Sequence, residues 1–386
     1  MAQNRQDMGS GPVKPLLLQL MIPAVVAQVV NLLYNIVDRI YIGHIEGIGA
    51  AALTGVGLFA PILMLLNAFA MLIGAGGAPR TAIALGQGNK NEAEKIIGNS
   101  FTMLLFFAVV LTAGFYAGAP ALLRLFGASD ATLPYAVAYG RIYILGSVFV
   151  LLVMGMNPFI TTQGFAKISM LTTIIGAVIN IILDPILIFG LGWGVRGAAV
   201  ATVLSQVASA VLTLRCIVGS QGMPWHIRAE KLRLHGDVFT AICTIGVPAA
   251  AQSAMYNISN MFIQSSMNSF GTSTIAAWGV YGKIDFLFWM TINSLGIAIT
   301  TFAGQNFGAR QYDRVRRGVR VCLAMAACTT LVISFTFYNL AEVLFRLFSQ
   351  DDAVVAVGVG MMHVLTPVYI TYVCIEVLAG ALRGCG

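Results

Sequence analysis

Length, composition and charge together place this chain in a membrane. Of its 386 residues, 58% are hydrophobic and only 10% are charged, and the mean hydropathy is +0.85. These values exclude a soluble globular domain. The net charge of +7 comes from basic residues in short breaks between apolar stretches. Basic residues confined to short breaks indicate the orientation of a membrane protein, and they exclude nucleic-acid binding as the role of these residues.

Ten apolar stretches follow one another along the chain, and each is long enough to cross a bilayer as a helix. They lie near residues 15–43, 50–77, 96–118, 133–157, 166–190, 194–217, 239–267, 275–303, 320–345 and 354–382. The sequence therefore predicts an all-α, polytopic membrane protein. The four histidines are scattered and the six cysteines lack metal-ligand spacing, so we expect neither an enzyme nor a cofactor.

Every second break between these stretches is basic. The residues concerned are Arg5, Lys14, Arg80, Lys90, Lys95, Lys167, Arg228, Lys231, Arg233, Arg310, Arg314, Arg316, Arg317 and Arg320. The positive-inside rule places these breaks, and the N-terminus, in the cytoplasm.

The first stretch carries a polar stripe that ends in a carboxylate. Asn31, Tyr34, Asn35 and Asp38 fall on one face of a helix. A carboxylate at membrane depth is costly unless it lines a wet cavity, so the stripe indicates a functional site. The alternative is that Asp38 lies at the interface and pairs with the adjacent Arg39.

The fifth and sixth stretches add further oxygen ligands. Asn180 and Asp184 lie four residues apart on one helix face, and Pro185 directly after them loosens that helix and frees backbone carbonyls. The sixth stretch contributes a hydroxyl from Thr202. Such hard oxygen ligands suit sodium or a proton better than a transition metal. Alternatively, Asp184 simply ends a helix, and Thr202, with Ser205 and Ser209, serves close helix packing.

An internal repeat divides the chain. Residues 23–28 (PAVVAQ) and 34–36 (YNI) recur as 248–252 (PAAAQ) and 256–258 (YNI), and residues 88–90 (GNK) recur as 308–310 (GAR). The repeat predicts two lobes related as parallel copies of a six-helix unit, with ten of twelve helices present. We place the first lobe at 1–220, a cytoplasmic loop at 221–237 and an incomplete second lobe at 238–386. Either the chain is a fragment, which we favour, or the second lobe does without two helices.

The second lobe lacks the charge of the first stripe. The repeat partner of Asp38 is Asn260, in an uncharged stripe with Tyr256, so we expect cation coupling in the first lobe. Lys283 and Asp285 are interpreted as a mutually neutralised pair.

Several blocks together resemble multidrug and toxic compound extrusion (MATE) transporters of prokaryotic type, within the larger group of multidrug, oligosaccharide-lipid and polysaccharide exporters. They are residues 34–38 (YNIVD), 180–185 (NIILDP), 197–202 (GAAVAT) and 302–309 (FAGQNFGA). Each block is modest alone, but their order and spacing are specific. The resemblance covers nearly the whole chain and implies a fold of two six-helix lobes.

The resemblance also implies roles for individual residues. Asp38, Asn180, Asp184 and Thr202 match the family's cation site, which takes a proton or sodium. Substrate-pocket positions are matched by Pro23, Tyr34, Asn35, Tyr139, Asn157, Tyr256 and Asn260. Some sodium-coupled members carry an acidic residue where this chain has Tyr256, which puts a second-lobe sodium site in doubt; Glu376 is a weak candidate to replace it.

The function expected is that of an antiporter, coupled to protons or sodium, that exports amphipathic cationic drugs by alternating access. We expect a monomer in a prokaryotic inner membrane, with small amphipathic molecules and the lipid bilayer as its partners. Two alternatives stay open. One is a flippase for a lipid-linked saccharide, which would need more arginine or lysine in its cavity. The other is a non-transporting, truncated membrane protein.

Overall fold

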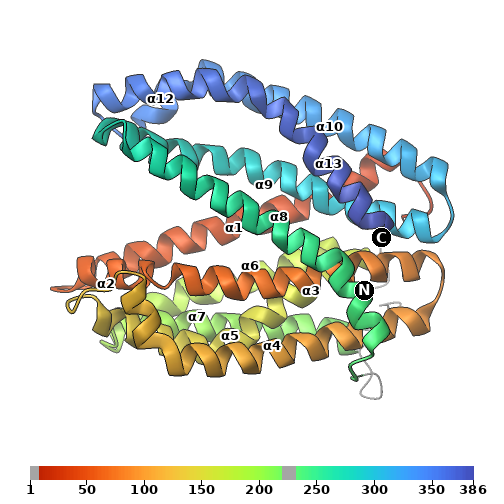
Figure 1. Ribbon diagram of the computed structural model, residues 1–386, viewed down its shortest axis with the longest axis horizontal. Helices are drawn as coiled ribbons and strands as arrows, with labels where there is room; N and C mark the ends of the chain where they lie inside the picture. Colours follow the sequence, from red (N-terminus) through yellow and green to blue (C-terminus); the bar gives the residue numbers. More distant parts are fainter. Residues whose placement is uncertain (1–7, 220–231) are drawn as a thin grey trace. The chain divides into compact units, whose positions relative to one another are not determined.

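The computed structural model describes residues 8–219 and 232–386, and these are helical apart from short turns (Figure 1). The elements in chain order are α1 (Val13–Gly43), α2 (Gly49–Gly57), α3 (Ala60–Gly86), α4 (Lys90–Leu125), α5 (Leu133–Thr162), α6 (Ala166–Pro185), the π-helix η2 (Ile186–Gly190), α7 (Val195–Gly219), α8 (Gly236–Asn268), α9 (Thr272–Gly308), α10 (Tyr312–Asn339), α11 (Ala341–Arg346), α12 (Asp352–Leu365), the 3-10 turn η4 (Thr366–Val368) and α13 (Tyr369–Cys385). The all-α prediction is confirmed.

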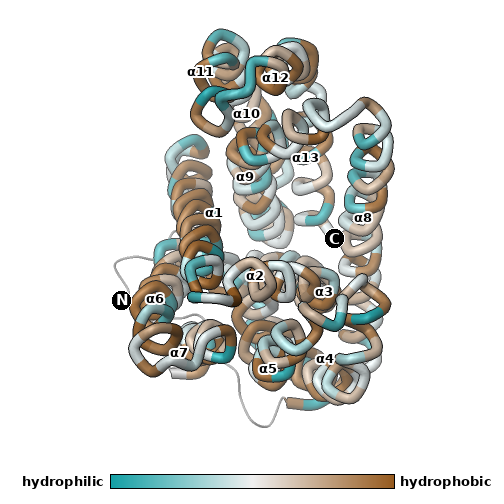
Figure 2. The backbone as a smooth tube through the Cα atoms, turned by 90° about the vertical axis from the view of Figure 1, so that its left-hand side faces the viewer, coloured by the Kyte–Doolittle hydropathy of each residue, from teal (hydrophilic) through white to brown (hydrophobic). Residues whose placement is uncertain are grey.

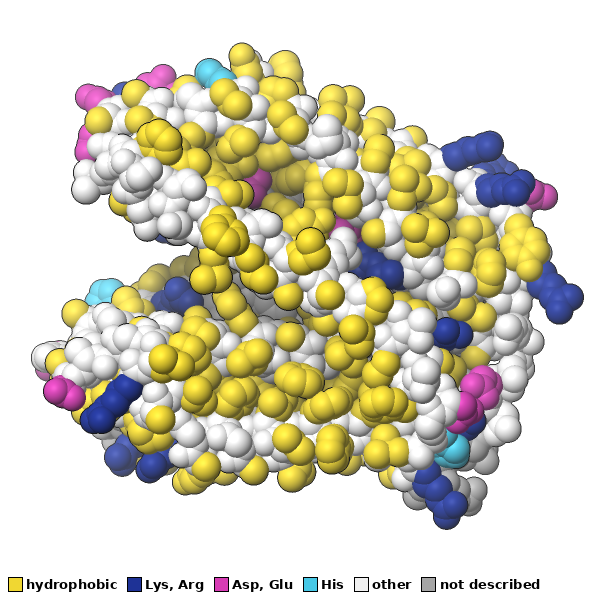
Figure 3. Space-filling model, viewed as in Figure 1, with side chains coloured by type: hydrophobic (Ala, Val, Ile, Leu, Met, Phe, Trp, Pro, Cys, Tyr) yellow, Lys and Arg dark blue, Asp and Glu magenta, His cyan; other side chains and the backbone are white. Residues whose placement is uncertain are grey.

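Ten segments of the described chain are long and apolar enough to cross a membrane, as the sequence predicts. Helices α2 and α3 together make one of these spans, and α12, η4 and α13 make the last. Figure 2 shows hydrophobic residues along most of their length. Large apolar side chains are exposed on the flanks of the helices, where Figure 3 shows them in yellow. In a membrane, lipid covers such surfaces.

Local sequence signals explain where several helices begin. The side chain of Asn89 accepts a hydrogen bond of 3.1 Å from the backbone N–H of Glu92 and caps α4. Asp351 caps α12 in the same way through Ala353, at 2.9 Å. Each bond satisfies one of the backbone donors that a helix N-terminus leaves without a partner.

The internal repeat is visible in the turns between helices. Helices α3 and α9 end 222 positions apart, at Gly86 and Gly308, and both turns then contain a residue with positive φ. That residue is Gly88 (φ 71°) in the first copy and Arg310 (φ 59°) in the second. The sequence comparison pairs Gly88 with Gly308, 220 positions later. The structure instead pairs Gly88 with Arg310, 222 positions later, because these two residues have the same positive φ at the same place in the turn.

The described chain divides into two compact units. One comprises the described part of residues 26–250, and the other comprises residues 8–25 with 251–386. Helices α1 and α8 are thus each shared between units, and each division falls two residues after a proline within the helix, Pro23 or Pro248. The predicted lobes at 1–220 and 238–386 stay a prediction, and the predicted loop at 221–237 lies largely outside the described residues.

Helix α5 is central to the first unit. It packs against α3, α4, α6 and α7, and its tyrosines Tyr139 and Tyr143 are buried around Phe59. The ring centroids of Phe59 and Tyr143 are 5.4 Å apart, edge to face. This aromatic packing holds α5 against the start of α3, and α5 carries residues of the site described below.

The first half of α8 is held against α3 and α4 within the same unit. Lys95 Nζ lies 2.6 Å from Asp237 Oδ2, and Asn99 donates a 3.0 Å hydrogen bond to the His235 carbonyl. Deeper along the helices, Gly76 and Gly246 allow the backbones of α3 and α8 to touch, because a Cβ at either position would meet a backbone carbonyl of the other helix. Small residues of this kind permit close helix packing in membranes.

The second unit is built around α9, which packs against α10, α12 and α13. The backbone just before α1 also belongs here. Arg314 donates hydrogen bonds of 3.0 Å and 2.8 Å to the carbonyls of Met8 and Ser10, and Asn306 donates to Met8 at 3.1 Å. The start of α1 is therefore anchored to α9 and α10.

Candidate functional site

The four residues expected to bind the coupling cation come together inside the first unit. Asp38 on α1, Asn180 and Asp184 on α6, and Thr202 on α7 are all buried. Asn180 Nδ2 lies 3.4 Å from Asp184 Oδ1 and 3.5 Å from Thr202 Oγ1. The carboxyl groups of Asp38 and Asp184 are close enough to interact electrostatically. Three helices that are distant in sequence thus place their oxygen atoms around one point.

Three oxygen atoms of this cluster have no hydrogen-bond partner among the described residues. They are Asp38 Oδ1, Asn180 Oδ1 and Asp184 Oδ2. Buried polar atoms are normally satisfied, and those that are not call for an explanation. Two carboxylates facing each other at membrane depth also repel strongly unless a proton or a metal cation neutralises one of them. The arrangement is suited to bind a small cation through hard oxygen ligands.

The backbone beside Asp184 is irregular, as Pro185 leads us to expect. Helix α6 ends at Pro185, and the chain continues as the π-helix η2. Proline cannot donate to the carbonyl of Ile181 four residues earlier, so one helical hydrogen bond is lost here and the helix is loosened. Single turns of π-helix are rare and occur often at functional sites. Asp184 thus lies both at the end of α6 and in the buried cluster, and its role there stays a prediction.

The structure does not favour the interfacial interpretation of Asp38. Asp38 is 9% exposed, whereas the adjacent Arg39 is exposed. Among the ion pairs of residues 8–219 and 232–386, none joins these two side chains. Neighbouring residues on a helix point in different directions, so Arg39 acts on Asp38 through its charge without forming an ion pair with it.

The packing interpretation is favoured for Ser209. Its hydroxyl donates a 3.0 Å hydrogen bond to the carbonyl of Thr172, and Gly176 gives it room between α6 and α7. Ser205 likewise donates to a backbone carbonyl, that of Thr202, at 2.7 Å. Both hydroxyls thus already donate their proton to a backbone carbonyl of α6 or α7.

We expect Ser209→Ala to weaken folding and leave cation binding unchanged. One interhelical hydrogen bond is lost, which costs about 1 kcal/mol. The measurement is the apparent unfolding temperature in detergent, with and without sodium. A sodium-induced stabilisation equal to that of the wild type is expected. Its loss in this variant would show that Ser209 is a ligand.

A cavity of about 360 Å³ lies in the first unit beside the cation cluster. It is lined by three of the predicted pocket residues, Tyr34, Asn35 and Asn157. The polar residues Asn67, Tyr143 and Thr173 line it too and were missed by the sequence analysis. Asn67 is a single amide within an apolar helix, a signal that could have been used. The remaining polar lining comes from Asn31, Ser205, Gln206 and Ser209.

The other predicted pocket residues lie elsewhere. Tyr139 is buried near Thr202 and stacked on Tyr143, with ring centroids 5.8 Å apart. Pro23 is buried within α1, in the segment that belongs to the second unit. Tyr256 and Asn260 are also in the second unit, where Tyr256 packs edge to face on Trp289 at 5.7 Å and Asn260 is exposed. Their role as pocket residues stays a prediction.

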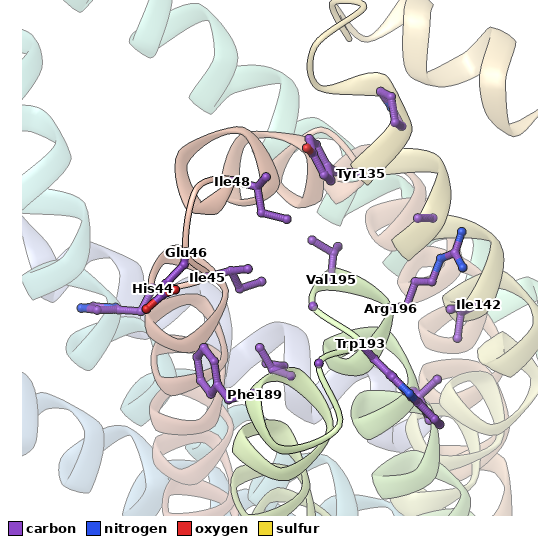
Figure 4. Close-up of a pocket in the computed structure, with 16 residues that line it drawn as sticks. His44, Ile45, Glu46, Ile48, Tyr135, Ile142, Phe189, Trp193, Val195 and Arg196 are labelled. Carbon is purple, nitrogen blue, oxygen red and sulfur yellow. The ribbon is translucent and has the colours of Figure 1, made fainter.

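A second and larger cavity, of about 1290 Å³, opens at one end of the first unit (Figure 4). Its lining comes from the turn between α1 and α2, the start of α5, η2, the turn that follows η2 and the start of α7. It includes His44, Glu46, Tyr135, Trp193 and Arg196. The sequence analysis did not single out these residues, which lie in the breaks between apolar stretches or at the very start of a stretch.

The second unit corrects one pairing expected from the sequence. Lys283 Nζ lies over the ring of Phe348, 5.4 Å from its centre, while Asp285 accepts hydrogen bonds from Tyr281 and Tyr369. Lys283 and Asp285 are therefore not a neutralised pair. The other acidic residue considered in the second unit, Glu376, forms an ion pair with Arg383 at 3.0 Å and accepts a hydrogen bond from Tyr372 at 3.1 Å.

Membrane-spanning helices around a buried cluster of carboxyl, amide and hydroxyl groups, with a polar cavity beside it, are features of a membrane transporter. The MatE family model matches residues 23–186 and 248–386 of this chain. The chain therefore belongs to the MatE family, whose members are transporters and not enzymes. It is a multi-pass membrane protein.

Individual relatives are distant but cover most of the chain. "Probable multidrug resistance protein YoeA" of Bacillus subtilis is 25% identical over 375 residues, which are 95% of this chain and 80% of that protein. The "FAD transporter" of Shewanella oneidensis is 24% identical over 358 residues, 91% of this chain and 78% of that protein.

Solved structures share the fold. The outward-facing conformation of a multidrug resistance MATE family transporter has a TM-score of 0.90 at 23% identity, over 98% of this chain and 84% of that one. A MOP superfamily transporter from Pyrococcus furiosus has a TM-score of 0.89, with the same identity and coverage. The predicted family and fold are thus confirmed.

Proposed function

We propose that the protein is an antiporter that exports amphipathic, cationic drugs or toxic compounds by alternating access, driven by protons or sodium ions. Its relatives among multidrug resistance proteins support drug export. The coupling cation would be held by Asp38, Asn180, Asp184 and Thr202.

One observation carries the coupling proposal, namely the two buried carboxyl groups that face each other between α1 and α6. Binding of a cation would neutralise charge at low dielectric and draw α1 toward α6. The cation and the drug need not touch in order to compete. They need only favour different conformations of α1, which contains Pro23 as a point of bending.

The chemistry of the smaller cavity favours cationic or neutral cargo. Its described lining consists of amides, hydroxyls and apolar groups and contains no lysine or arginine. A flippase for a lipid-linked saccharide would have to hold a pyrophosphate, for which basic side chains are the usual partners. For the same reason, an anionic cargo such as FAD, which the name of the Shewanella oneidensis relative gives, fits this cavity less well than a cationic one.

We further propose that the protein acts as a monomer in a prokaryotic cytoplasmic membrane with its N-terminus inside. The basic breaks that begin α4 and α10 support this orientation through the positive-inside rule.

The test is transport in proteoliposomes that contain the purified protein and a cationic dye. A sodium gradient and a proton gradient are imposed separately, each with the membrane potential clamped. Dye movement against its own gradient, driven by one of the two, is expected. Dye movement that depends on neither gradient would contradict coupling. Absence of dye movement, together with transfer of a lipid-linked saccharide, would favour the flippase.

A further inference from the structure

The first turns of α10 carry a high density of positive charge. Residues 312–322, with which α10 begins, contain four arginines and one aspartate, a net charge of +3, and Arg310 lies two residues before them. The repeat partner of this segment, residues 90–100 at the start of α4, contains two lysines and two glutamates and has no net charge. Figure 3 shows basic side chains, in dark blue, gathered at the end of the second unit where α10 begins. The excess of charge is thus specific to the second copy.

In the first copy, acidic side chains neutralise the basic ones. Lys90 lies 3.8 Å from Glu94, and Lys95 lies 2.6 Å from Asp237. Both lysines at the start of α4 therefore have a carboxylate partner within the first unit.

In the second copy, most of the arginines have no such partner. Arg316 lies 3.7 Å from Asp313, but both side chains are largely exposed, and ion pairs of this kind contribute little. None of the ion pairs of the described residues involves Arg310, Arg317 or Arg320. Their charge remains available to attract an anion.

The arginines divide between two faces of α10. Arg314 belongs to the buried face, where it donates to the carbonyls of residues 8 and 10 and lies over the ring of Phe302, 5.5 Å from its centre. The buried face continues at four-residue intervals through Gly318, Cys322, Ala326 and Thr330. Arg316, Arg317 and Arg320 are exposed. The face with Arg317 and Arg320 continues along the helix as an exposed apolar stripe, Ala324, Cys328, Leu331 and Phe335.

The length of α10 places these arginines at the surface of a membrane. Its 28 residues rise about 42 Å at 1.5 Å per residue, whereas the hydrocarbon core of a bilayer is about 30 Å thick. Residues 321–339 contain no charged side chain and are suited to that core. The two to three turns before them, which carry the arginines, then lie at the level of the lipid headgroups.

Arg310 occupies a backbone conformation that is costly for any residue except glycine. Its φ is 59°, and among the described non-glycine residues it alone has a positive φ. The corresponding residue of the first copy is Gly88, which adopts this conformation without the steric cost. Strain of this kind is retained where it serves a function. Here it adds a further exposed arginine beside the start of α10.

We propose that the first turns of α10 bind the phosphate groups of anionic phospholipids such as phosphatidylglycerol, with the acyl chains along the exposed apolar stripe. The leaflet concerned is the cytoplasmic one in the proposed orientation. Arginine suits this role because its guanidinium group binds phosphate oxygens in pairs, and basic clusters next to a membrane span attract anionic lipids. A soluble anion would use the arginines and leave the stripe below them unused. This inference does not depend on the proposed export function.

The test measures lipid binding without transport. The purified protein in a neutral maltoside detergent at low ionic strength is titrated with dioctanoyl phosphatidylglycerol, and the apparent unfolding temperature is followed. A ligand that binds only the folded state stabilises it by mass action, so the titration gives a dissociation constant. Arg320→Gln should raise this constant about fivefold, and the triple variant Arg316→Gln, Arg317→Gln, Arg320→Gln about 100-fold. The corresponding triple change to lysine keeps the charge and should retain most of the affinity.

Two reference ligands distinguish a lipid site from a general anion site. Dioctanoyl phosphatidylcholine has the same acyl chains without net charge, and glycerophosphoglycerol is the headgroup of phosphatidylglycerol without chains. Both should bind at least about tenfold more weakly than phosphatidylglycerol. Equal stabilisation by phosphatidylcholine would overturn the role of the arginines. Equal stabilisation by glycerophosphoglycerol would show a site for soluble anions and would overturn the lipid assignment.

The matched control removes three exposed basic side chains elsewhere, through Arg124→Gln, Lys167→Gln and Arg233→Gln. Its affinity for phosphatidylglycerol should equal that of the wild type. If the triple variant at the start of α10 fails to fold, Arg320→Gln alone decides. An unchanged dissociation constant in Arg320→Gln, or an equal loss in the control, would overturn the site. Because no transport is measured, that result would leave the proposed export function untouched.

Discussion

Asp38→Asn should abolish gradient-driven export while the protein still inserts and folds. The variant keeps the size of the side chain and removes the charge that a coupling cation would neutralise, so the two states of the cluster no longer differ electrostatically. We expect the initial rate of dye export to fall by at least about 100-fold, as is usual when a group essential to a coupled site is removed. The measurement is gradient-driven dye movement in proteoliposomes at matched protein content.

Asp184→Asn should have the same effect, and the double variant should be no worse than either single one. Residues that act as one unit are strongly non-additive, whereas independent contributions would multiply. Asp130→Asn is the control, since Asp130 is an exposed carboxylate between α4 and α5. Export at the normal rate from Asp38→Asn would remove the central observation behind coupling. Multiplicative losses would show that the two carboxylates serve separate sites.

Gly246→Ala should destabilise the protein more than any surface change. A Cβ at this position would meet the backbone carbonyl of Leu72 on α3, and Gly76 opposite it has the same relation to Ile242 on α8. Because the obstacle is backbone and not a flexible side chain, the two helices must separate. We expect a loss of about 3 kcal/mol, seen as an apparent unfolding temperature lower by about 5 °C or more.

Gly114→Ala is the matched control for this change. Gly114 lies within α4, and a Cβ there would meet nothing within 4 Å. Alanine is the better helix former, so a neutral or slightly stabilising effect is expected. Equal losses at the two positions would mean that glycine flexibility, and not close contact between α3 and α8, sets the stability.

The convergence of Asp38, Asn180, Asp184 and Thr202 could be anticipated from sequence because its signal is local. A carboxylate in an apolar stretch is conspicuous, and the four-residue spacing of Asn180 and Asp184 already fixes their common face. The ten spans follow from the same kind of reasoning, since hydropathy depends only on neighbouring residues. Pro185 predicted an irregular backbone, but the sequence did not predict that it would be a π-helix. The hydrogen bonds from the turn before α7 back to Ile186, Leu187 and Ile188 belong to that conformation.

The features that were missed depend on contacts between residues distant in sequence. Asp285 was paired with Lys283 because they are near in sequence, yet residues two apart on a helix face different ways. Its hydrogen-bond partners are Tyr281, one turn earlier, and Tyr369, which lies on α13. The cavity residue Asn67 could not be connected with Asn157 before α3 and α5 were packed together. The sharing of α1 between units was also out of reach, since periodicity does not say which neighbours a helix has.

The sharing of α1 has a consequence for biosynthesis. Residues 8–25 pack with residues 251–386, which leave the ribosome more than two hundred residues later. Arg314, which fixes the carbonyls of Met8 and Ser10, is synthesised last among these three partners. The amino-terminal half of α1 must therefore wait in the nascent chain, inserted but without its final neighbours, while the rest of the first unit assembles. Its apolar character lets lipid take the place of those neighbours during that interval.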